Sequence, residues 1–136
     1  MNLSDIHFHL VDDNDIDTSV NMKLLHLANI SEHINTYSSA IKFLATLKES
    51  PSLFTQGRHI VLLDIMMPGM DGFECLAELE KIDTTLTQNM HVFMLSSSID
   101  RNNISKAEKF EIVKRVIEKP LDVYTLKMAL EDIFMD

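Results

Sequence analysis

The sequence predicts an α/β protein in which a central five-stranded parallel sheet lies between two layers of helices. Five short apolar runs have strand length, and most of them are apolar at nearly every position, as in strands buried on both faces. Segments with helical spacing of apolar residues separate these runs. Alternating strands and helices connect by right-handed crossovers, which make the sheet parallel and cover both of its faces.

The predicted strands differ in how strongly the sequence indicates them. In chain order they cover residues 6–11, 34–37, 59–64, 90–95 and 113–117. The run at 59–64 is too short and too soon broken to be a helix, since Pro68, Gly69 and Gly72 follow it in a loop. The run at 34–37 is the weakest, because polar residues interrupt it. We therefore expect residues 59–64 to form a central strand.

Capping residues and apolar periodicity define the predicted helices. Asn14 or Asp15 can cap the first helix, Ser38 or Ser39 the second, and Asp100 the fourth. The fourth helix, ending at about residue 110, has a thin apolar side, and residues 49–58 and 83–89 read as loops. The apolar positions that support the helices are Ile16, Val20, Leu24, Leu27, Ala28; Ile41, Phe43, Leu44, Leu47; Phe73, Leu76, Ala77, Leu79; Ile104, Ala107, Phe110; and Leu121, Leu126, Met128, Ala129, Leu130, Ile133.

Composition excludes several functional classes. The chain has 136 residues, 12 Lys and Arg against 21 Asp and Glu, and a formal net charge of −9. Direct binding to nucleic acid is not expected, because phosphates would repel this charge. The sequence contains neither a signal-peptide pattern nor an apolar run of about 18 residues, so we expect no membrane span. The single cysteine, Cys75, fits a reducing, cytoplasmic compartment, and its apolar surroundings favour a buried, inert thiol.

Charged and polar side chains follow four of the predicted strands. Asp12 and Asp13 follow the first strand, Asp64 ends the third, Ser96 follows the fourth, and Lys119 follows the fifth. Because all carboxyl ends of a parallel sheet lie along one edge, these groups should meet in one crevice. Three carboxylates repel one another unless a cation neutralises them, and hard oxygen ligands suit Mg²⁺. A metal, a lysine and a hydroxyl can receive a phosphoryl group, for which Asp64 is the natural nucleophile.

Five motifs together resemble the receiver domain of two-component response regulators, of the stand-alone CheY-like kind. Each motif is weak by itself, but the five occur in order and cover essentially the whole chain. They are Val11-Asp12-Asp13-Asn14, Leu62-Leu63-Asp64, Met67-Pro68-Gly69-Met70-Asp71-Gly72, Leu95-Ser96-Ser97-Ser98 and Glu118-Lys119-Pro120. The resemblance implies a (βα)5 flavodoxin-like fold in a single receiver domain over residues 1–136, with no output domain.

The resemblance also implies roles for the residues of the crevice. Asp64 is the expected phosphoacceptor, and Ser96 and Lys119 are expected to contact the phosphoryl oxygens. The Lys119–Pro120 peptide bond is expected to be cis. The implied Mg²⁺ ligands are Asp12 (mainly through water or by positioning), Asp13, Asp64 and the backbone carbonyl of Met66.

The implied function is phosphorelay signalling rather than enzymatic turnover. A sensor histidine kinase or a histidine phosphotransfer protein would phosphorylate Asp64 in the presence of Mg²⁺. The domain would catalyse this transfer onto itself, lose the phosphoryl group slowly, and signal to an unidentified target through protein–protein contacts. The alternative functions are a binding scaffold of the same fold that is not phosphorylated and an aspartyl-phosphate phosphatase.

Two departures from the usual receiver pattern predict how the phosphorylated state behaves. Val116 stands three residues before Lys119, where receivers usually have Tyr or Phe, so we expect no aromatic side chain to report phosphorylation. The 96–100 loop and the helix after it would carry the signal instead. Met66 and Ser98 lie two residues after Asp64 and Ser96, and neither is suited to orient an attacking water molecule. We therefore expect a long-lived phosphoryl group.

Three other patterns support weaker interpretations. Residues 13–17 begin like an EF-hand loop, but Thr18 and Leu24 stand where such a loop has Gly and Glu. Residues 15–18 resemble the aspartyl-phosphate motif of haloacid-dehalogenase phosphatases, but they lie inside a predicted helix. His7 and His9 would point to the same side of a strand, yet no third metal ligand stands at useful spacing.

Overall fold

The computed structural model describes residues 5–134, and within this range the five predicted strands form one parallel sheet. The strand order is β2-β1-β3-β4-β5, so the strand that ends at Asp64 is central, as predicted. The fold is the expected α/β, flavodoxin-like arrangement. The strands are β1 (Ile6–Val11), β2 (His33–Tyr37), β3 (Arg58–Asp64), β4 (Met90–Ser96) and β5 (Val113–Glu118).

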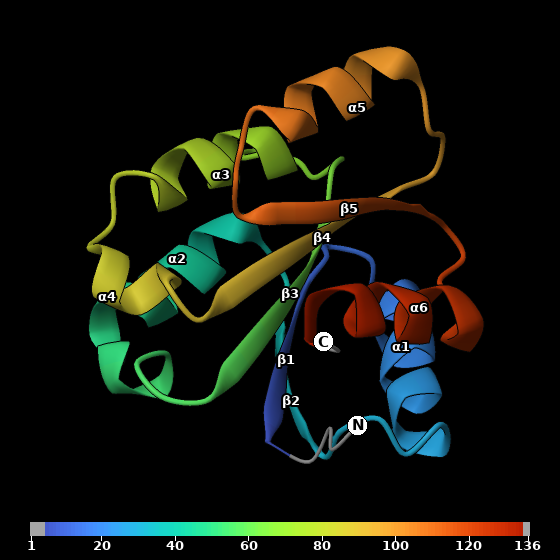
Figure 1. Ribbon diagram of the computed structural model, residues 1–136. Helices are drawn as coiled ribbons and strands as arrows, with labels where there is room; N and C mark the ends of the chain where they lie inside the picture. The colour runs from blue at the N-terminus through green and yellow to red at the C-terminus, as the bar shows by residue number, and fades with distance from the viewer. Residues whose placement is uncertain (1–4, 135–136) are drawn as a thin grey trace.

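Helices cover both faces of the sheet. In Figure 1, α1 and α6 lie on one face, and α2, α3 and α5 lie on the other. The helices are α1 (Asp15–Leu27), α2 (Ala40–Glu49), α3 (Gly72–Leu79), α4 (Thr84–Thr87), α5 (Arg101–Glu108) and α6 (Val123–Phe134). The predicted caps are confirmed: Asn14 caps α1, Ser39 caps α2 and Asp100 caps α5 through side-chain hydrogen bonds to backbone amides.

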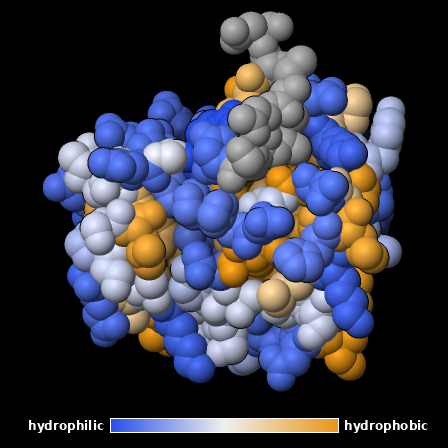
Figure 2. All heavy atoms as spheres, turned by 90° about the horizontal axis from the view of Figure 1, so that it is seen from below, coloured by the Kyte–Doolittle hydropathy of each residue, from blue (hydrophilic) through white to orange (hydrophobic). Residues whose placement is uncertain are grey.

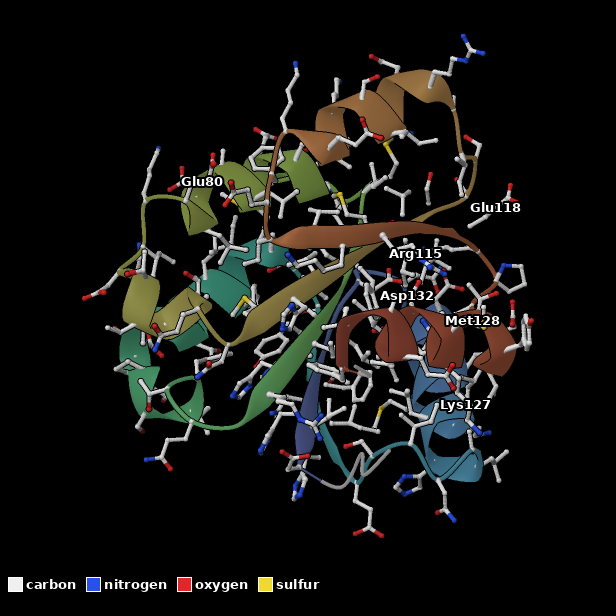
Figure 3. The ribbon with its side chains drawn as sticks, viewed as in Figure 1. Glu80, Arg115, Glu118, Lys127, Met128 and Asp132 are labelled. Carbon is white, nitrogen blue, oxygen red and sulfur yellow. The ribbon has the colours of Figure 1, made fainter. Side chains whose placement is uncertain are left out.

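A hydrophobic core fills each side of the sheet. Val61 and Leu63 of β3 face the α2 and α3 side, and Ile60 and Leu62 of the same strand face the α1 and α6 side. All four are fully or almost fully buried, as a strand covered on both faces requires. Arg115 of β5 forms an ion pair with Asp132 of α6 across one flank, and the two side chains point toward each other in Figure 3.

The apolar spacing of the first helix does not match the face that it buries. Ile16, Val20 and Leu27 are 75%, 52% and 88% exposed, whereas Asn21 and Leu25 of the same helix are buried. Ile41 of α2 is likewise exposed, although Phe43, Leu44 and Leu47 are buried as expected. Leu24 and Ala28 pack against the core as predicted, so the predicted face of α1 was wrong only by part of a turn: a buried asparagine occupies a position that periodicity assigns to the polar side.

Two connections contain more regular structure than the sequence indicated. Residues 83–89 include the four-residue helix α4, which Asp83 caps. Residues 49–58 include a single 3₁₀ turn, η1 (Pro51–Leu53), with Pro51 at its start. Both elements contain too few residues to show a helical periodicity of apolar positions, so the sequence gave no signal for them.

Four histidines gather at the amino-terminal edge of the sheet, and we call them the histidine cluster: His7, His9, His33 and His59. The strand register places His33, His7 and His59 side by side on β2, β1 and β3. Their rings stack, with centroids 4.7 Å apart for His7 and His33 and 5.0 Å apart for His7 and His59. His7 of β1 therefore has histidine neighbours on two further strands, which the sequence did not predict.

The face of the molecule that Figure 2 shows is largely hydrophilic. Figure 2 shows the molecule from below the view of Figure 1, and on this face hydrophobic residues appear in separate places among hydrophilic ones. None of the helices found between residues 5 and 134 combines the length and the apolar character that crossing a membrane requires.

Candidate functional site

The parallel register brings the polar strand ends to one edge of the sheet, as predicted. Val11 of β1 is the register partner of Leu63 of β3, so the next residues along the two strands, Asp12 and Asp64, lie side by side. Asp12 and Asp64 are 4% and 5% exposed, and Asp13 is exposed. The crevice therefore combines two buried carboxylates with one that solvent reaches.

The three carboxylates lie close enough to share one cation. Asp12, Asp13 and Asp64 each offer a carboxylate oxygen, and these oxygens all lie within 4.8 Å of one another. Carboxylate oxygens with room for water molecules suit Mg²⁺, which usually takes one or two direct carboxylates. The donor set therefore fits the predicted metal, with the exposed Asp13 on the side from which a hydrated ion would enter.

Lys119 supplies the positive charge of the site in this structure. Its Nζ atom lies 3.1 Å from Asp64 Oδ2, 3.4 Å from Asp12 Oδ2 and 3.1 Å from Asp17 Oδ2. The Lys119–Pro120 peptide bond is cis, as expected. Lys119 therefore lies in one crevice with Asp12 and Asp64, as predicted, whereas its contact with Asp17 was not predicted.

The pKa values of Asp12 and Lys119 are both raised, but for different reasons. Burial, with a contribution from the charge of Asp64, raises the pKa of Asp12 to about 6. Burial disfavours the charged form of Lys119, but hydrogen bonds to Asp64 and Asp17 outweigh it and raise the pKa of the ammonium. The lysine therefore stays charged at neutral pH and holds together carboxylates that would otherwise repel one another.

Backbone groups fix the orientation of the carboxylates. The amide of Asn14 donates to Asp12 Oδ1 at 2.9 Å, and the amide of Met66 donates to Asp64 Oδ1 at 3.2 Å. These bonds leave Oδ2 of both aspartates directed at Lys119. Met66 is thereby part of the site through its backbone, while its side chain is 72% exposed. A role for its carbonyl as a metal ligand remains a prediction.

Gly72 permits the loop after Asp64 to fold back closely on the strand. Its amide donates to the carbonyl of Ile65 at 2.9 Å. A Cβ atom at position 72 would lie 2.7 Å from the carbonyl oxygen of Asp64 and 2.9 Å from Cε of Met94. A side chain at this position would therefore displace the backbone of the central aspartate.

The Ser96 hydroxyl is turned into its own loop. It donates to the backbone carbonyl of Ser98 and accepts a hydrogen bond from the Ser98 amide. The carbonyl of Ser96 accepts from the Lys119 amide at 2.8 Å, which ties the ends of β4 and β5 together. Ser96 thus stands at the predicted edge, and its side chain would have to rotate away from Ser98 to meet a phosphoryl oxygen.

Helix α1 excludes the EF-hand interpretation and brings Asp17, which the sequence did not assign to the site, next to Lys119. The segment 15–27 is helical, so residues 13–17 do not form a calcium-binding loop. Asp17, in the first turn of this helix, contacts Lys119 and lies at the site. Its proximity to Asp12 and Asp13 in the sequence was the available signal, but the sequence gave no reason to direct this helical side chain toward the fifth strand.

The predicted departures from the receiver pattern lie around the same crevice. Val116 is partly buried and packs against the core on the α2 and α3 side, three residues before Lys119. Ser98 is exposed beside Ser96. Helix α5, which follows this loop, buries Ala107 in the core, and most of its other residues are exposed.

Comparisons with known proteins agree with this geometry. Residues 8–131 match the family model described as the response regulator receiver domain. A two-component response regulator from Cytophaga hutchinsonii is 25% identical, with a TM-score of 0.87 over 98% of this chain and 99% of that one. A response regulator receiver protein from Dyadobacter fermentans is 27% identical, with a TM-score of 0.78 over 93% of this chain and 96% of that one.

A CheY-like receiver domain protein from Methanospirillum hungatei is 27% identical, with a TM-score of 0.66 over 94% of this chain and 90% of that one. Receiver domains are signalling modules that in general bind Mg²⁺ and interact with kinases and phosphotransfer proteins. The family match covers nearly the whole described chain, and the fold and the clustered aspartates agree with it. This chain therefore belongs to the response regulator receiver domain family.

Proposed function

We propose that this protein accepts a phosphoryl group on Asp64 and carries the resulting signal to a protein target. The observation that supports the proposal most directly is the contact of Lys119 with Asp64 inside a cluster of acidic residues. A carboxylate that is buried, oriented and paired with an ammonium is suited to attack a phosphoryl group whose negative charge the ammonium offsets.

The transfer would proceed from a phosphohistidine of a sensor kinase or a phosphotransfer protein. An oxygen of the Asp64 carboxylate forms a bond to phosphorus while the bond between phosphorus and the donor imidazole nitrogen breaks. The electron pair of the broken bond returns to the imidazole, which leaves as a neutral ring after taking up a proton from solvent. Lys119 offsets the charge on the phosphoryl oxygens during this exchange.

Asp12, Asp13, Asp64 and the Met66 carbonyl would hold Mg²⁺, which supplies charge neutralisation at the phosphoryl oxygens when bound. Ser96 would donate its hydroxyl to a phosphoryl oxygen after releasing the Ser98 carbonyl. The donor can approach because solvent reaches Asp13 at the rim of the crevice. We place the reaction in the cytoplasm, where the buried thiol of Cys75 would stay reduced.

The test is incubation with acetyl phosphate and Mg²⁺, followed by measurement of the intact mass. We expect one added phosphoryl group in the natural protein and in Asp15→Asn, a control in the same region, and none in Asp64→Asn. The absence of an adduct in the natural protein would instead support a binding scaffold that is not phosphorylated. Repeated turnover with release of phosphate would support a phosphatase.

The lifetime of the phosphoryl group tests the predicted role of position 66. The exposed Met66 side chain cannot hydrogen-bond an attacking water molecule, so we expect slow hydrolysis. Met66→Asn supplies an amide at this position and should shorten the half-life several-fold, whereas Met66→Leu should not. Rapid loss from the unmodified protein would contradict this expectation.

The output of the signal is proposed to involve the 96–100 loop and α5. Ser96 joins the loop to the phosphorylation site, and α5 is held by few buried side chains. Elements with a small apolar contact have low local stability and shift readily. Amide hydrogen exchange with and without a phosphoryl mimic should change between residues 99 and 110, and unchanged protection there would exclude this segment as the output.

A further inference from the structure

The Lys119 ammonium is shared by three carboxylates of the described chain, and one of them lies outside the strand ends. Asp12 directly follows β1 and Asp64 ends β3, whereas Asp17 lies in the first turn of α1. The Nζ atom is equally distant, at 3.1 Å, from the nearest oxygens of Asp17 and Asp64. In this structure Asp17 therefore competes with the phosphoacceptor for the same cation.

The local fold fixes Asp17 in this place. The Asn14 side chain accepts hydrogen bonds from the amides of Ile16 and Asp17, both at 3.0 Å, and starts the helix directly after β1. The turn of the helix then directs the Asp17 carboxylate toward the end of β5. A groove of about 340 Å³ adjoins this contact, and its lining includes Asp17, Val20 and Pro120.

The three contacts of Lys119 differ in their exposure to solvent. The side chains of Asp12 and Asp64 are 5% and 7% exposed, and that of Asp17 is 39% exposed. An ammonium has three N–H donors, and three carboxylates occupy the ammonium here. Before Lys119 can donate to a phosphoryl oxygen, it must weaken one of these contacts, and the exposed Asp17 loses least because water can solvate it.

We propose that Asp17 is a positioning residue that holds Lys119 on the α1 side of Asp64 and competes with the phosphoryl group for it. This inference rests on the proposed function of Asp64. It assigns to Asp17 an influence on how strongly the phosphorylated state is favoured. Removing its charge should free the ammonium and favour that state through Lys119.

The test uses beryllofluoride, a stable mimic of a phosphoryl group, titrated into the full chain with Mg²⁺ and followed by ¹⁹F NMR. Asp17→Asn should bind the mimic about two- to fivefold more tightly than the natural protein, the range that a partly exposed ion pair supports. The gain should shrink at high salt, because exposed charges are screened. Asp17→Glu restores the charge and should return the affinity toward that of the natural protein.

Asp15→Asn is the matched control. Asp15 lies in the same first turn of α1, so its substitution removes an equal charge from the helix terminus, but Asp15 forms no ion pair with Lys119 in the described structure. Its affinity should stay that of the natural protein. Equal affinities of Asp17→Asn and Asp15→Asn, or weaker binding by Asp17→Asn, would overturn the role of Asp17. If the natural protein bound no beryllofluoride, the proposed function itself would fail.

Discussion

The two ends of the same strands bury ionisable side chains in two different ways. At the carboxyl-terminal edge, the acidic side chains of Asp12 and Asp64 stay close together because Lys119 lies between them. At the amino-terminal edge, His9 and His59 are each 1% exposed and no opposite charge accompanies them in the described structure. The buried carboxylates of one edge are held by the charge of Lys119, and the buried histidines of the other edge by hydrogen bonds between neutral groups.

The hydrogen bonds of the histidine cluster determine which nitrogen carries each proton. The carbonyl of Gln56 can only accept, so His59 donates to it from Nε2, at 2.8 Å. In the neutral ring His59 Nδ1 is then an acceptor, and it receives the Nε2–H of His9 at 3.0 Å. His9 Nδ1 accepts in turn from the hydroxyl of Tyr37 at 3.0 Å. In this arrangement both ring nitrogens of His9 and of His59 are hydrogen-bonded while the two rings are neutral.

The two edges differ in whether their polar groups can change partners. At the charged edge, Lys119 can exchange one carboxylate partner for another ligand, because the site is partly open to solvent. The histidine cluster is packed against Phe43 and Phe54, and every polar atom of His9 is already paired. Substitutions at the two edges should therefore differ in their effects on stability and on ligand binding.

The largest effect is expected from His9→Ala. The substitution empties a buried ring position and leaves the Tyr37 hydroxyl and His59 Nδ1 without their partners. We expect a loss of about 3 kcal/mol in the free energy of unfolding, in the range for truncating a large buried side chain. Denaturant unfolding at pH 7.5 measures it, and beryllofluoride affinity should be unchanged. A loss below about 1 kcal/mol would show that the cluster contributes little to stability.

The second effect is a dependence of stability on pH, with opposite signs at the two edges. Burial, with smaller contributions from His59 and His7, lowers the pKa of His9 to about 3. The unfolded chain then binds more protons than the native protein below pH 6.5, so stability falls on acidification. From pH 7.5 to pH 5, His9 alone accounts for a loss of about 2 kcal/mol.

Asp12 acts in the other direction, because burial raises its pKa to about 6. The native protein therefore binds more protons than the unfolded chain around pH 4 to 6, and the contribution of Asp12 to stability is lost as the pH rises through its native pKa. Without Mg²⁺, His9→Leu should flatten the acid loss of stability and Asp12→Asn should steepen it. The same slope in both variants would refute the opposition between the edges.

The sequence predicted which side chains meet at the carboxyl-terminal edge of the sheet, but it did not predict the histidine cluster at the amino-terminal edge. Asp12, Asp64, Ser96 and Lys119 each follow an apolar run, and parallel strands bring such residues to one edge whatever their lateral order. The histidine cluster requires the register that pairs His7 with both His33 and His59, and register is not readable from one sequence. For this reason the site was predicted and the cluster was not.

Helix orientation set a second limit on prediction. Asp17 reaches Lys119 only because α1 is rotated so that Asn21 and Leu25 face the sheet. Periodicity favoured a face through Ile16 and Val20, which are exposed. Because apolar side chains of α1 are exposed, the predicted buried face of the helix was rotated from the observed one. The direction of the Asp17 side chain could therefore not be predicted.

The third effect is the increase in the free energy of unfolding that Mg²⁺ binding should cause. At a concentration ten times its dissociation constant, a ligand that binds the native state alone stabilises it by about 1.4 kcal/mol. We expect this increase in the natural protein and in His9→Ala, because among the described residues the hydrogen bonds of His9 and those of Lys119 share no residue, and distant effects add. Asp13→Asn should lose most of the increase. Thermal unfolding with and without Mg²⁺ measures it, and a smaller increase in His9→Ala would show that the edges are linked.

The smallest effect is expected at the exposed end of the histidine cluster. His33 stacks on His7 at a centroid distance of 4.7 Å but is exposed, so His33→Ala should change the free energy of unfolding by about 0.5 kcal/mol or less at pH 7.5. Burial, the charge of His59 and the charge of His33 lower the pKa of His7, in that order. Removing His33 should therefore move the pKa of His7 upward, which NMR titration of the His7 Cε1–H resonance measures. An unchanged His7 pKa would mean that burial and His59 alone account for its shift, and that only the inner part of the cluster interacts.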